Sequence, residues 1–327
     1  YQVIIQSKPD SSRGKRYMNL INEKAIDNYV ENFSLRKMFV FPVLLFLISL
    51  SILAYTEFTT GSPVELGVEF SGGTAIIFDS AKTPEELRIE FQDYNIVQAR
   101  EYGGTGRKLI QFGPMSDSQH NEVTGKINSA YTSVEIRQMG EVVSKSLQVQ
   151  ALRAIVFSFI GMAIVVFLIF RTLVPSVAVV SAALADIIFA VAMMNVFGVV
   201  LSLGTVAALL MLIGYSVDTN ILLTNRLLKR RGELNEKIKD AMKTGLTMTT
   251  TTLVALVTLF VVSSGSYIVS SFTRIDIIMD ISAVLIFGLI ADLINTWMTN
   301  LGILKWFIKK DQNVEIRTRK TKRGKAA

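Results

Sequence analysis

The sequence predicts a membrane protein in which a bundle of six helices carries one inserted α+β domain. Half of its 327 residues are apolar and only 19% are charged, a composition typical of integral membrane proteins. The apolar residues gather in runs long enough to cross about 30 Å of hydrocarbon as helices. One stretch between the first two runs, residues 56–150, instead has the mixed composition of a small water-soluble domain.

Six spans follow from these runs, each close to the roughly 20 residues that a membrane-crossing helix needs. Gly198 alone separates the third run from the fourth, which predicts a tight hairpin there. A segment 1–37 precedes the bundle, a loop 224–246 joins its fourth and fifth helices, and a basic tail 309–327 ends the chain. The predicted spans are 38–55, 154–170, 174–197, 199–223, 247–269 and 277–307, the last five lying within 151–308.

Lys and Arg are distributed unevenly between the two sides of this bundle. With the N-terminus in the cytoplasm, 24 of the 34 fall on the cytoplasmic side, in 1–37, at Arg171, in 226–243 and from Lys305 onward. Short loops rich in Lys and Arg stay in the cytoplasm, whereas long domains translocate regardless of charge. We therefore expect a multi-pass protein of the cell membrane with both termini cytoplasmic and residues 56–150 extracytoplasmic. The basic tail is expected to attract anionic membrane lipids.

The inserted domain has a readable order of elements. Thr83, Pro84 and Glu86 combine an N-cap, a proline at the first helical position and a capping-box acid, which predicts a helix to about residue 94. Ser116 caps a second helix to about residue 130 in the same way. Strands are expected at 74–79, 95–102, 108–112 and 132–138. The order β-α-β-β-α-β predicts a ferredoxin-like sandwich, with two helices on one face of a four-stranded antiparallel sheet.

Composition argues against several classes of function. There is no cysteine and a single histidine, His120, outside the apolar runs, so no thiolate site, Cys nucleophile or Ser-His-acid set is available. The glycines of 67–74 are followed by neither Lys-Ser/Thr nor a helix, so a bend into the domain is a better interpretation than a phosphate loop. The basic residues lie beside apolar runs, which does not suggest nucleic acid. We expect no enzyme activity, no cofactor and no metal site.

Three carboxylates, Asp186, Asp218 and Asp292, interrupt the apolar runs. An acid within hydrocarbon is costly and usually functional, and removal from water disfavours its charged form. These acids are therefore candidates for carrying a proton or another ion. Arg226, two turns below Asp218 and about 12 Å away along the axis, could mark the cytoplasmic mouth of a polar path, and Lys243 is the other nearby base.

Small and polar residues on the same helices suggest close packing around these acids. One face of the fourth span is expected to pack against another helix rather than lipid. A second such stripe follows the sixth span through Gly288, Asp292, Asn295 and Thr299. The hydroxyls of 247–252 are expected to bond between helices. The alternative is that these acids only hold the bundle together through hydrogen bonds to neighbouring Thr or Asn. The small-residue face consists of Gly204, Ala207, Ala208, Met211, Gly214 and Asp218.

Three groups of residues form motifs along the chain: Gly67, Glu69, Phe70, Gly72, Gly73 and Thr74; Gly214, Ser216, Thr219 and Asn220; and Thr251 and Thr252. They resemble the glycine-rich, fourth-span and Thr-rich fifth-span signatures of the SecF family of protein-export membrane proteins. The resemblance covers nearly the whole chain from the first span onward. Where bacterial members usually carry Asn-Asp, this chain has Asp218-Thr219, a form that looks archaeal and moves the acid by one position.

This resemblance implies an accessory subunit of the Sec pathway. Such a subunit would pair with SecD beside the SecYEG translocon and use the proton motive force or another ion gradient to help an unfolded polypeptide leave the membrane. The resemblance also implies one six-span half of the RND transporter architecture. A small-molecule transporter of the RND type and a purely structural partner of SecD are the alternatives.

Overall fold

The computed structural model describes residues 23–32, 35–102, 106–229, 232–264 and 276–310. Six of its helices are long and apolar enough to cross a membrane, as the sequence predicted. They are α2 (Leu35–Thr60), α6 (Glu141–Phe170), α7 (Leu173–Phe197), α8 (Leu203–Lys229), α9 (Leu234–Ser263) and α10 (Asp276–Ile294), the last continuing through a π-helix, η3 (Asn295–Asn300), to Lys310. The predicted end of the fifth span and the basic tail beyond Lys310 lie outside the described residues.

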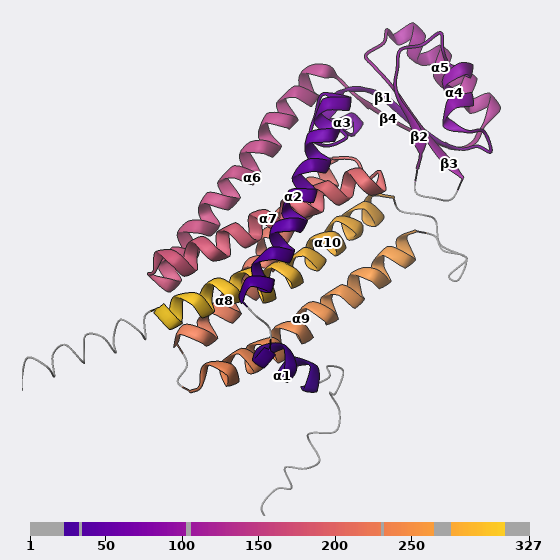
Figure 1. Cartoon of the computed structure of the whole chain (residues 1–327). Coiled ribbons are helices and arrows are strands. Elements are labelled where there is room, and N and C mark those ends of the chain that lie inside the picture. The colour runs from indigo at the N-terminus through magenta and orange to yellow at the C-terminus, as the bar shows by residue number, and fades with distance from the viewer. Residues whose placement is uncertain (1–22, 33–34, 103–105, 230–231, 265–275, 311–327) are drawn as a thin grey trace, which may run out of the picture.

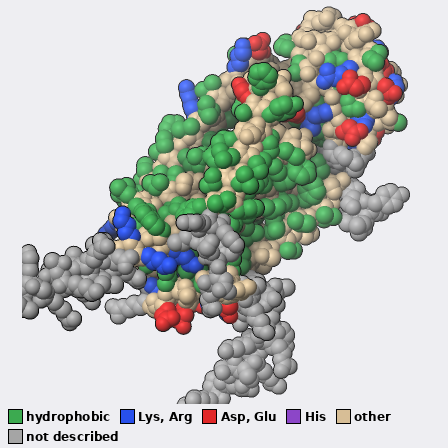
Figure 2. Space-filling view, in the orientation of Figure 1, with side chains coloured by type: hydrophobic (Ala, Val, Ile, Leu, Met, Phe, Trp, Pro, Cys, Tyr) green, Lys and Arg blue, Asp and Glu red, His purple; other side chains and the backbone are tan. Residues whose placement is uncertain are grey.

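The six helices form an inner and an outer group (Figure 1). In the apolar stretch of α7, α8 and α10 about half of the residues are buried inside the protein (50 to 56%). In the corresponding stretch of α2, α6 and α9 only 11 to 17% are buried. The outer helices therefore turn large apolar side chains outward, and Figure 2 shows this hydrophobic surface over the body of the bundle. Such a surface is expected to face lipid, because exposing an apolar area of this size to water is unfavourable.

Several boundaries differ from those expected. Most of the predicted loop 224–246 is helical, because α8 continues to Lys229 and α9 already begins at Leu234. Helix α6 begins at Glu141, well before the apolar run, and extends out toward the α/β domain. The third and fourth spans are separated by 198–202 rather than by Gly198 alone. Gly198 takes φ +67° at the end of α7, a left-handed cap that suits glycine, and Leu201 then pairs with Leu66 instead of entering α8.

The α/β domain follows the predicted order of elements. Its four-stranded antiparallel sheet has the order β2-β3-β1-β4. One face is covered by the two helices, which share a core with the inward side chains of the strands, such as Ile76, Phe78, Ile110 and Phe112. The elements are β1 (Gly73–Asp79), α4 (Pro84–Glu90), β2 (Ile96–Glu101), β3 (Arg107–Phe112), α5 (Asp117–Ala130) and β4 (Thr132–Met139).

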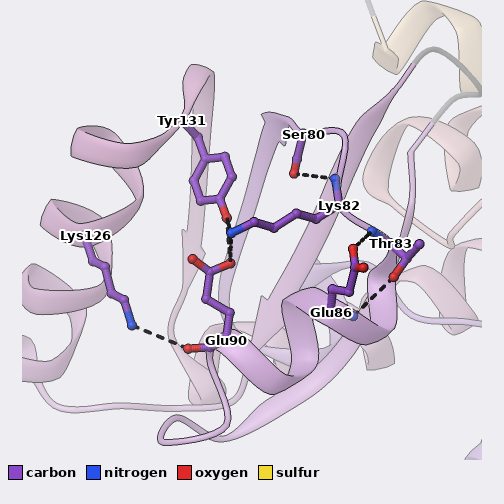
Figure 3. A network of polar contacts seen from close by, with 7 residues as sticks. All are labelled: Ser80, Lys82, Thr83, Glu86, Glu90, Lys126 and Tyr131. Atoms are coloured by element: carbon purple, nitrogen blue, oxygen red, sulfur yellow. Dashed lines mark hydrogen bonds and ion pairs between the residues drawn. The ribbon is translucent and has the colours of Figure 1, made fainter.

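Both predicted caps form, at Thr83 and Ser116. Figure 3 shows the polar contacts that join α4 to the rest of the domain, close to the cap at Thr83. Glu90 accepts hydrogen bonds from Lys82 Nζ at 3.0 Å and from Tyr131 Oη at 2.6 Å, and Lys126 Nζ donates to the Glu90 carbonyl at 3.4 Å. This network lies on the side of the domain away from the bundle, so its role is to join α4 to the rest of the domain.

The glycine-rich segment forms the joint between domain and bundle. It contains a short helix, α3 (Val68–Ser71), followed by Gly72 and Gly73 with φ of +76° and +92°. Gly67 N donates to Leu201 O at 2.8 Å, and Leu201 N donates to Glu65 O at 2.7 Å. A Cβ at Gly67 would lie 2.9 Å from that Leu201 oxygen, so the close approach requires glycine.

A side chain on β2 strengthens this joint. Arg100 donates to the carbonyl of Gly198 at the end of α7, and Gln98 Nε2 donates to Glu65 Oε2 at 2.8 Å. On the bundle side, Asn195 accepts from Glu65 N at 3.4 Å and donates to Pro63 O at 2.9 Å. The second face of the sheet is thereby held against the loop between α7 and α8.

Candidate functional site: a buried pair of carboxylates

Asp186 lies halfway along α7 and is fully buried. Both of its carboxylate oxygens accept short hydrogen bonds from neighbouring helices. Ser216 Oγ on α8 donates to Oδ2 at 2.6 Å, and Asn295 Nδ2 on the π-helix donates to Oδ1 at 2.6 Å. Asp186 therefore joins the three inner helices at one point.

Asp292 lies on α10 and is also fully buried. Its Oδ1 accepts hydrogen bonds from Thr296 Oγ1 at 2.9 Å and from Asn220 Nδ2 at 3.4 Å. Among the described residues, its Oδ2 is buried without a hydrogen-bond partner. An unsatisfied carboxylate oxygen inside a protein is expensive, so this atom is the feature of the site that most needs an explanation.

Ser216 and Asn220 connect the two acids, which we call the acid pair. Asn220 Nδ2 lies 3.4 Å from Ser216 Oγ, the hydroxyl that donates to Asp186, and it also contacts Asp292. On the other side, Asn300 Nδ2 donates to Asn220 Oδ1 at 2.6 Å. We call the polar residues around the pair the polar column, which comprises Ser216, Asn220, Thr224, Asn295, Thr296 and Asn300, all of them buried.

The π-helix supplies half of the polar column. Asn295, Thr296 and Asn300 all lie within η3. A π turn carries one extra residue and disturbs the regular backbone bonds, and such turns often mark functional sites. Here the hydroxyl of Tyr29, from α1 (Glu23–Asn32), donates to the Trp297 carbonyl at 2.8 Å. The indole of Trp297 lies where a Cβ at Gly245 on α9 would meet it at 2.5 Å.

In the part of the chain that the structure describes, no Lys or Arg forms an ion pair with either acid. The ion pairs that the structure describes lie instead in the α/β domain, near the start of α6, and between α1 and α9. The described residues also contain no group of three or more acids or histidines suited to a metal ion. The acid pair is thus two buried carboxylates whose described partners are neutral hydroxyl and amide groups, an arrangement that favours uptake of a positive charge.

Asp218 lies elsewhere. Asp218, Gly214 and Met211 are exposed on the outside of α8, so no described helix of this chain covers this part of the face that is expected to pack against another helix. Two residues turn an α-helix by about 200°, so Ser216 and Asn220, on either side of Asp218, point inward while Asp218 points away. The small-residue face is therefore exposed only in part. Gly204 lies against Ile277 on α10, and Ala208 is buried.

The two predicted bases are also outside the acid pair. Arg226 donates to the carbonyl of Asp240 at 2.8 Å and so ties the end of α8 to α9. Lys243 is exposed on α9. The hydroxyls of Thr251 and Thr252 donate to carbonyls of α9 itself, so the expected bonds between helices are wrong for these residues.

Some members of the site were missed in the sequence. Thr224, Thr296 and Asn300 were not singled out, although Thr296 and Asn300 follow Asp292 by four and eight residues, the spacing that keeps side chains on one helix face. Arg100 was missed as well, because nothing in a strand sequence shows that it will meet the loop after α7.

Comparisons with known proteins place the chain among protein-export components. Residues 119–310 match the family model described as "Protein export membrane protein SecD/SecF, C-terminal". A protein from Methanolacinia petrolearia named "Protein-export membrane protein SecF" is 44% identical over 281 residues, which cover 86% of this chain and 96% of that relative. One from Pyrococcus furiosus with the same name is 40% identical over 286 residues, covering 86% and 93%.

A solved structure agrees at the level of the fold. The crystal structure of SecDF from Thermus thermophilus, described as a translocon-associated membrane protein, matches with a TM-score of 0.66 at 20% sequence identity. The match covers 83% of this chain but only 38% of the SecDF chain. The chain thus corresponds to less than half of that larger protein.

Proposed function

This chain belongs to the SecD/SecF family of protein-export membrane proteins, and we propose that it acts as the SecF-type accessory subunit of the Sec pathway. In this role it pairs with a SecD protein beside the SecYEG translocon and uses an ion gradient to assist a translocating unfolded polypeptide. The single observation that carries the coupling part of the proposal is the acid pair, which is buried in the membrane bundle without a described basic partner.

The pairing with SecD is supported by the outer face of α8. Ala207, Gly214 and Asp218 are exposed there, and a Cβ at Gly214 would meet nothing within 4 Å. Small residues allow close approach of a second helix in lipid, and an acid is costly at a lipid-facing position. The Thermus SecDF chain, of which this chain matches 38%, holds a further region that a separate SecD could provide.

Two finer points belong to the same proposal. The strand order β2-β3-β1-β4, with α4 and α5 on one face, supports a ferredoxin-like assignment for the α/β domain. The distribution of Lys and Arg supports cytoplasmic termini and an extracytoplasmic domain. In this orientation α1, the C-terminal end of α8 and the C-terminal end of the helix that continues α10 through η3 face the cytoplasm.

The partner is tested by affinity purification of the tagged full-length chain from its native membrane. A SecD-like protein should co-purify with the wild type and be lost or much reduced with Gly214→Leu. Gly161→Leu on α6 is the matched control, since a Cβ at Gly161 also meets nothing within 4 Å. Recovery of no SecD-like protein with the wild type would remove the pairing.

Coupling is tested by export of a secreted reporter in cells that carry the chain as their sole copy. Asp292→Asn should slow export at normal abundance of the protein and its partner. Equal export by the variant and the wild type would leave the acids as structural contacts and favour a purely organising role. Extrusion of a small molecule by the reconstituted chain alone would instead favour the transporter alternative.

A further inference from the structure

We propose that helix α1 is a removable strap that holds the π turn of the sixth span, η3, in place, with Tyr29 as the residue that positions this turn. The strap, residues 23–32, lies at the end of the bundle remote from the α/β domain, beside α9 (Figure 1). This role goes beyond the proposed function, because it concerns two arrangements of the bundle that can be measured without export.

One face of the strap is buried against the bundle. Ile26, Tyr29 and Val30 are spaced three and four residues apart, which places them on the same side of a helix. Ile26 and Val30 are buried among apolar side chains of α8, α9 and the continuation of α10, and Trp297 of the π turn is one of these. The strap therefore covers the end of the bundle where these three helices meet.

The hydroxyl of Tyr29 reaches the backbone of the π turn. Its Oη donates to the carbonyl of Trp297 at 2.8 Å. A π turn disturbs the regular backbone bonds of a helix, so a donor from outside the helix helps to decide which carbonyls are satisfied. Burial raises the pKa of Tyr29 to about 12, so the phenol keeps its proton and remains a donor at physiological pH.

Helix α9 holds the side chain of the same residue. The indole of Trp297 is buried, and a Cβ at Gly245 on α9 would lie 2.5 Å from its Cζ2. Tyr29 thus holds the carbonyl of Trp297 while α9 holds its indole. The turn that they fix also supplies three residues of the polar column, namely Asn295, Thr296 and Asn300.

The strap is attached by few polar bonds. Buried Lys305 donates from Nζ to the carbonyl of Val30 at 3.3 Å, in the last turn of α1, where a cation is favourable. Asp27 pairs with Lys239 on α9 at 2.9 Å, but these side chains are 52% and 26% exposed, and such surface pairs contribute little. A helix of ten residues is marginal in water by itself. We therefore expect α1 to be helical only while it is docked.

Release of the strap removes the outside donor from the π turn. A π turn carries one extra residue, so its return to a regular α-helix turns the residues at its far end by about 100° relative to those before it. Asn300, the last residue of η3, would then leave Asn220 Oδ1, to which it donates at 2.6 Å. The strap therefore separates a docked arrangement with the π turn from an undocked arrangement without it.

The test uses Trp297 as a reporter in the purified full-length chain. The sequence holds two tryptophans, so Trp306→Phe leaves Trp297 as the single one. Adding Tyr29→Phe removes only the hydroxyl, and the loss of one hydrogen bond should speed hydrogen exchange of the α1 amides about two- to tenfold. The η3 amides should exchange faster in parallel, and the Trp297 emission should shift to longer wavelength with stronger quenching by acrylamide. Tyr55→Phe, at an exposed position of α2, is the matched control and should change none of these.

A tether distinguishes release of the strap from a general loss of stability. The chain has no cysteine, so Asp27→Cys with Lys239→Cys creates one pair of thiols that a short bis-maleimide can join. Joining them in the Tyr29→Phe chain should restore slow η3 exchange and the original Trp297 emission. Faster exchange of α1 with unchanged η3 exchange and emission would show that α1 docks without holding the π turn, and no change in either would show that Tyr29 does not hold the strap. A tether that restores neither signal would also overturn the proposal. Each of these results is independent of whether the chain assists export.

Discussion

Leu212 on α8 packs onto Gly288 on α10 so closely that a Cβ at position 288 would lie 2.2 Å from one Leu212 methyl and 2.8 Å from its Cγ. This contact joins the two inner helices one turn from the acid pair, and it brings their backbones together through the absence of a side chain. It is also the apolar layer that separates the acids from the side of the α/β domain.

Gly288→Ala should therefore destabilise the bundle. The whole Leu212 side chain must move to make room, and such overpacking typically costs about 1–3 kcal/mol. The measurement is the thermal unfolding midpoint of the detergent-purified protein. Gly214→Ala on the outer face of α8, where a Cβ meets nothing within 4 Å, should leave the midpoint unchanged or raise it slightly. A similar decrease in both variants would contradict the packing described here.

Gly73→Ala should destabilise the α/β domain more severely. Its φ of +92° disfavours any side chain, and its Cβ would lie 2.1 Å from the backbone oxygen of Phe112, which cannot move aside without breaking the β1–β3 pairing. Gly125 lies in the middle of α5 with open space around it. Gly125→Ala should therefore stabilise the domain, by about 0.5–1 kcal/mol in the free energy of unfolding. The measurement is hydrogen exchange of the β1 and β3 amides in the full-length chain, which should become faster in Gly73→Ala but not in Gly125→Ala.

The Glu90 network predicts that the α/β domain loses stability in acid. Burial by itself raises the pKa of Glu90, but the hydrogen bonds from Tyr131 and Lys82 outweigh it and lower the pKa below its usual value. A carboxyl whose folded pKa is lowered stabilises the fold above its unfolded pKa, about 4.3, and loses this contribution as pH falls through the lower folded value.

The protection of the α4 amides, measured relative to their intrinsic exchange rates at the same pH, should accordingly decrease below about pH 4. Glu90→Gln should remove most of the extra acid sensitivity of α4 and be less stable at neutral pH, because an amide accepts weaker bonds from Lys82 and Tyr131. Glu85→Gln, in the first turn of the same helix, serves as the control. An α4 whose exchange in acid matches between Glu90→Gln and the wild type would count against the network.

Arg100→Ala should loosen the α/β domain from the bundle without unfolding either. The charged hydrogen bond to Gly198 is of the kind worth about 1.5–3 kcal/mol, and its loss leaves a helix-end carbonyl unsatisfied. The amides of Gly67 and Leu201, whose hydrogen bonds form the joint, should exchange faster, while β1 amides stay protected. Lys126→Ala, on the exposed side of α5, is the control. Protection of Gly67 and Leu201 that survives Arg100→Ala would show that the arginine does not hold the joint.

The six apolar spans and the order of elements in the α/β domain could be predicted because each of these elements carries a local signal. Apolar runs of membrane length, the capping boxes at Thr83 and Ser116, and the alternation of the strands depend only on neighbouring residues. The hairpin between α7 and α8 was misjudged for the opposite reason. Its residues look like part of an apolar helix, and only the distant Leu66 gives them a different partner.

The site shows the same limit. A buried acid can be predicted from its apolar neighbours, and this reasoning correctly selected Asp186 and Asp292 as buried. It treated Asp218 in the same way, although which side of a helix faces inward depends on the neighbouring helices. The inward positions of Ser216 and Asn220, two residues before and after Asp218, determine that it points out. Nothing local to α8 reveals that orientation.

The short pairing of Leu66 with Leu201 has a consequence for biogenesis. Leu66 emerges from the ribosome before the α/β domain is complete, whereas Leu201 follows two further membrane passes. The domain can fold as soon as its own strands have been synthesised, but it cannot dock against the loop between α7 and α8 until α7 has been inserted and the chain has turned back toward α8. Docking is therefore a late event in synthesis, and a nascent chain halted before α7 would carry a domain that is finished yet still tethered only by α2 and α6.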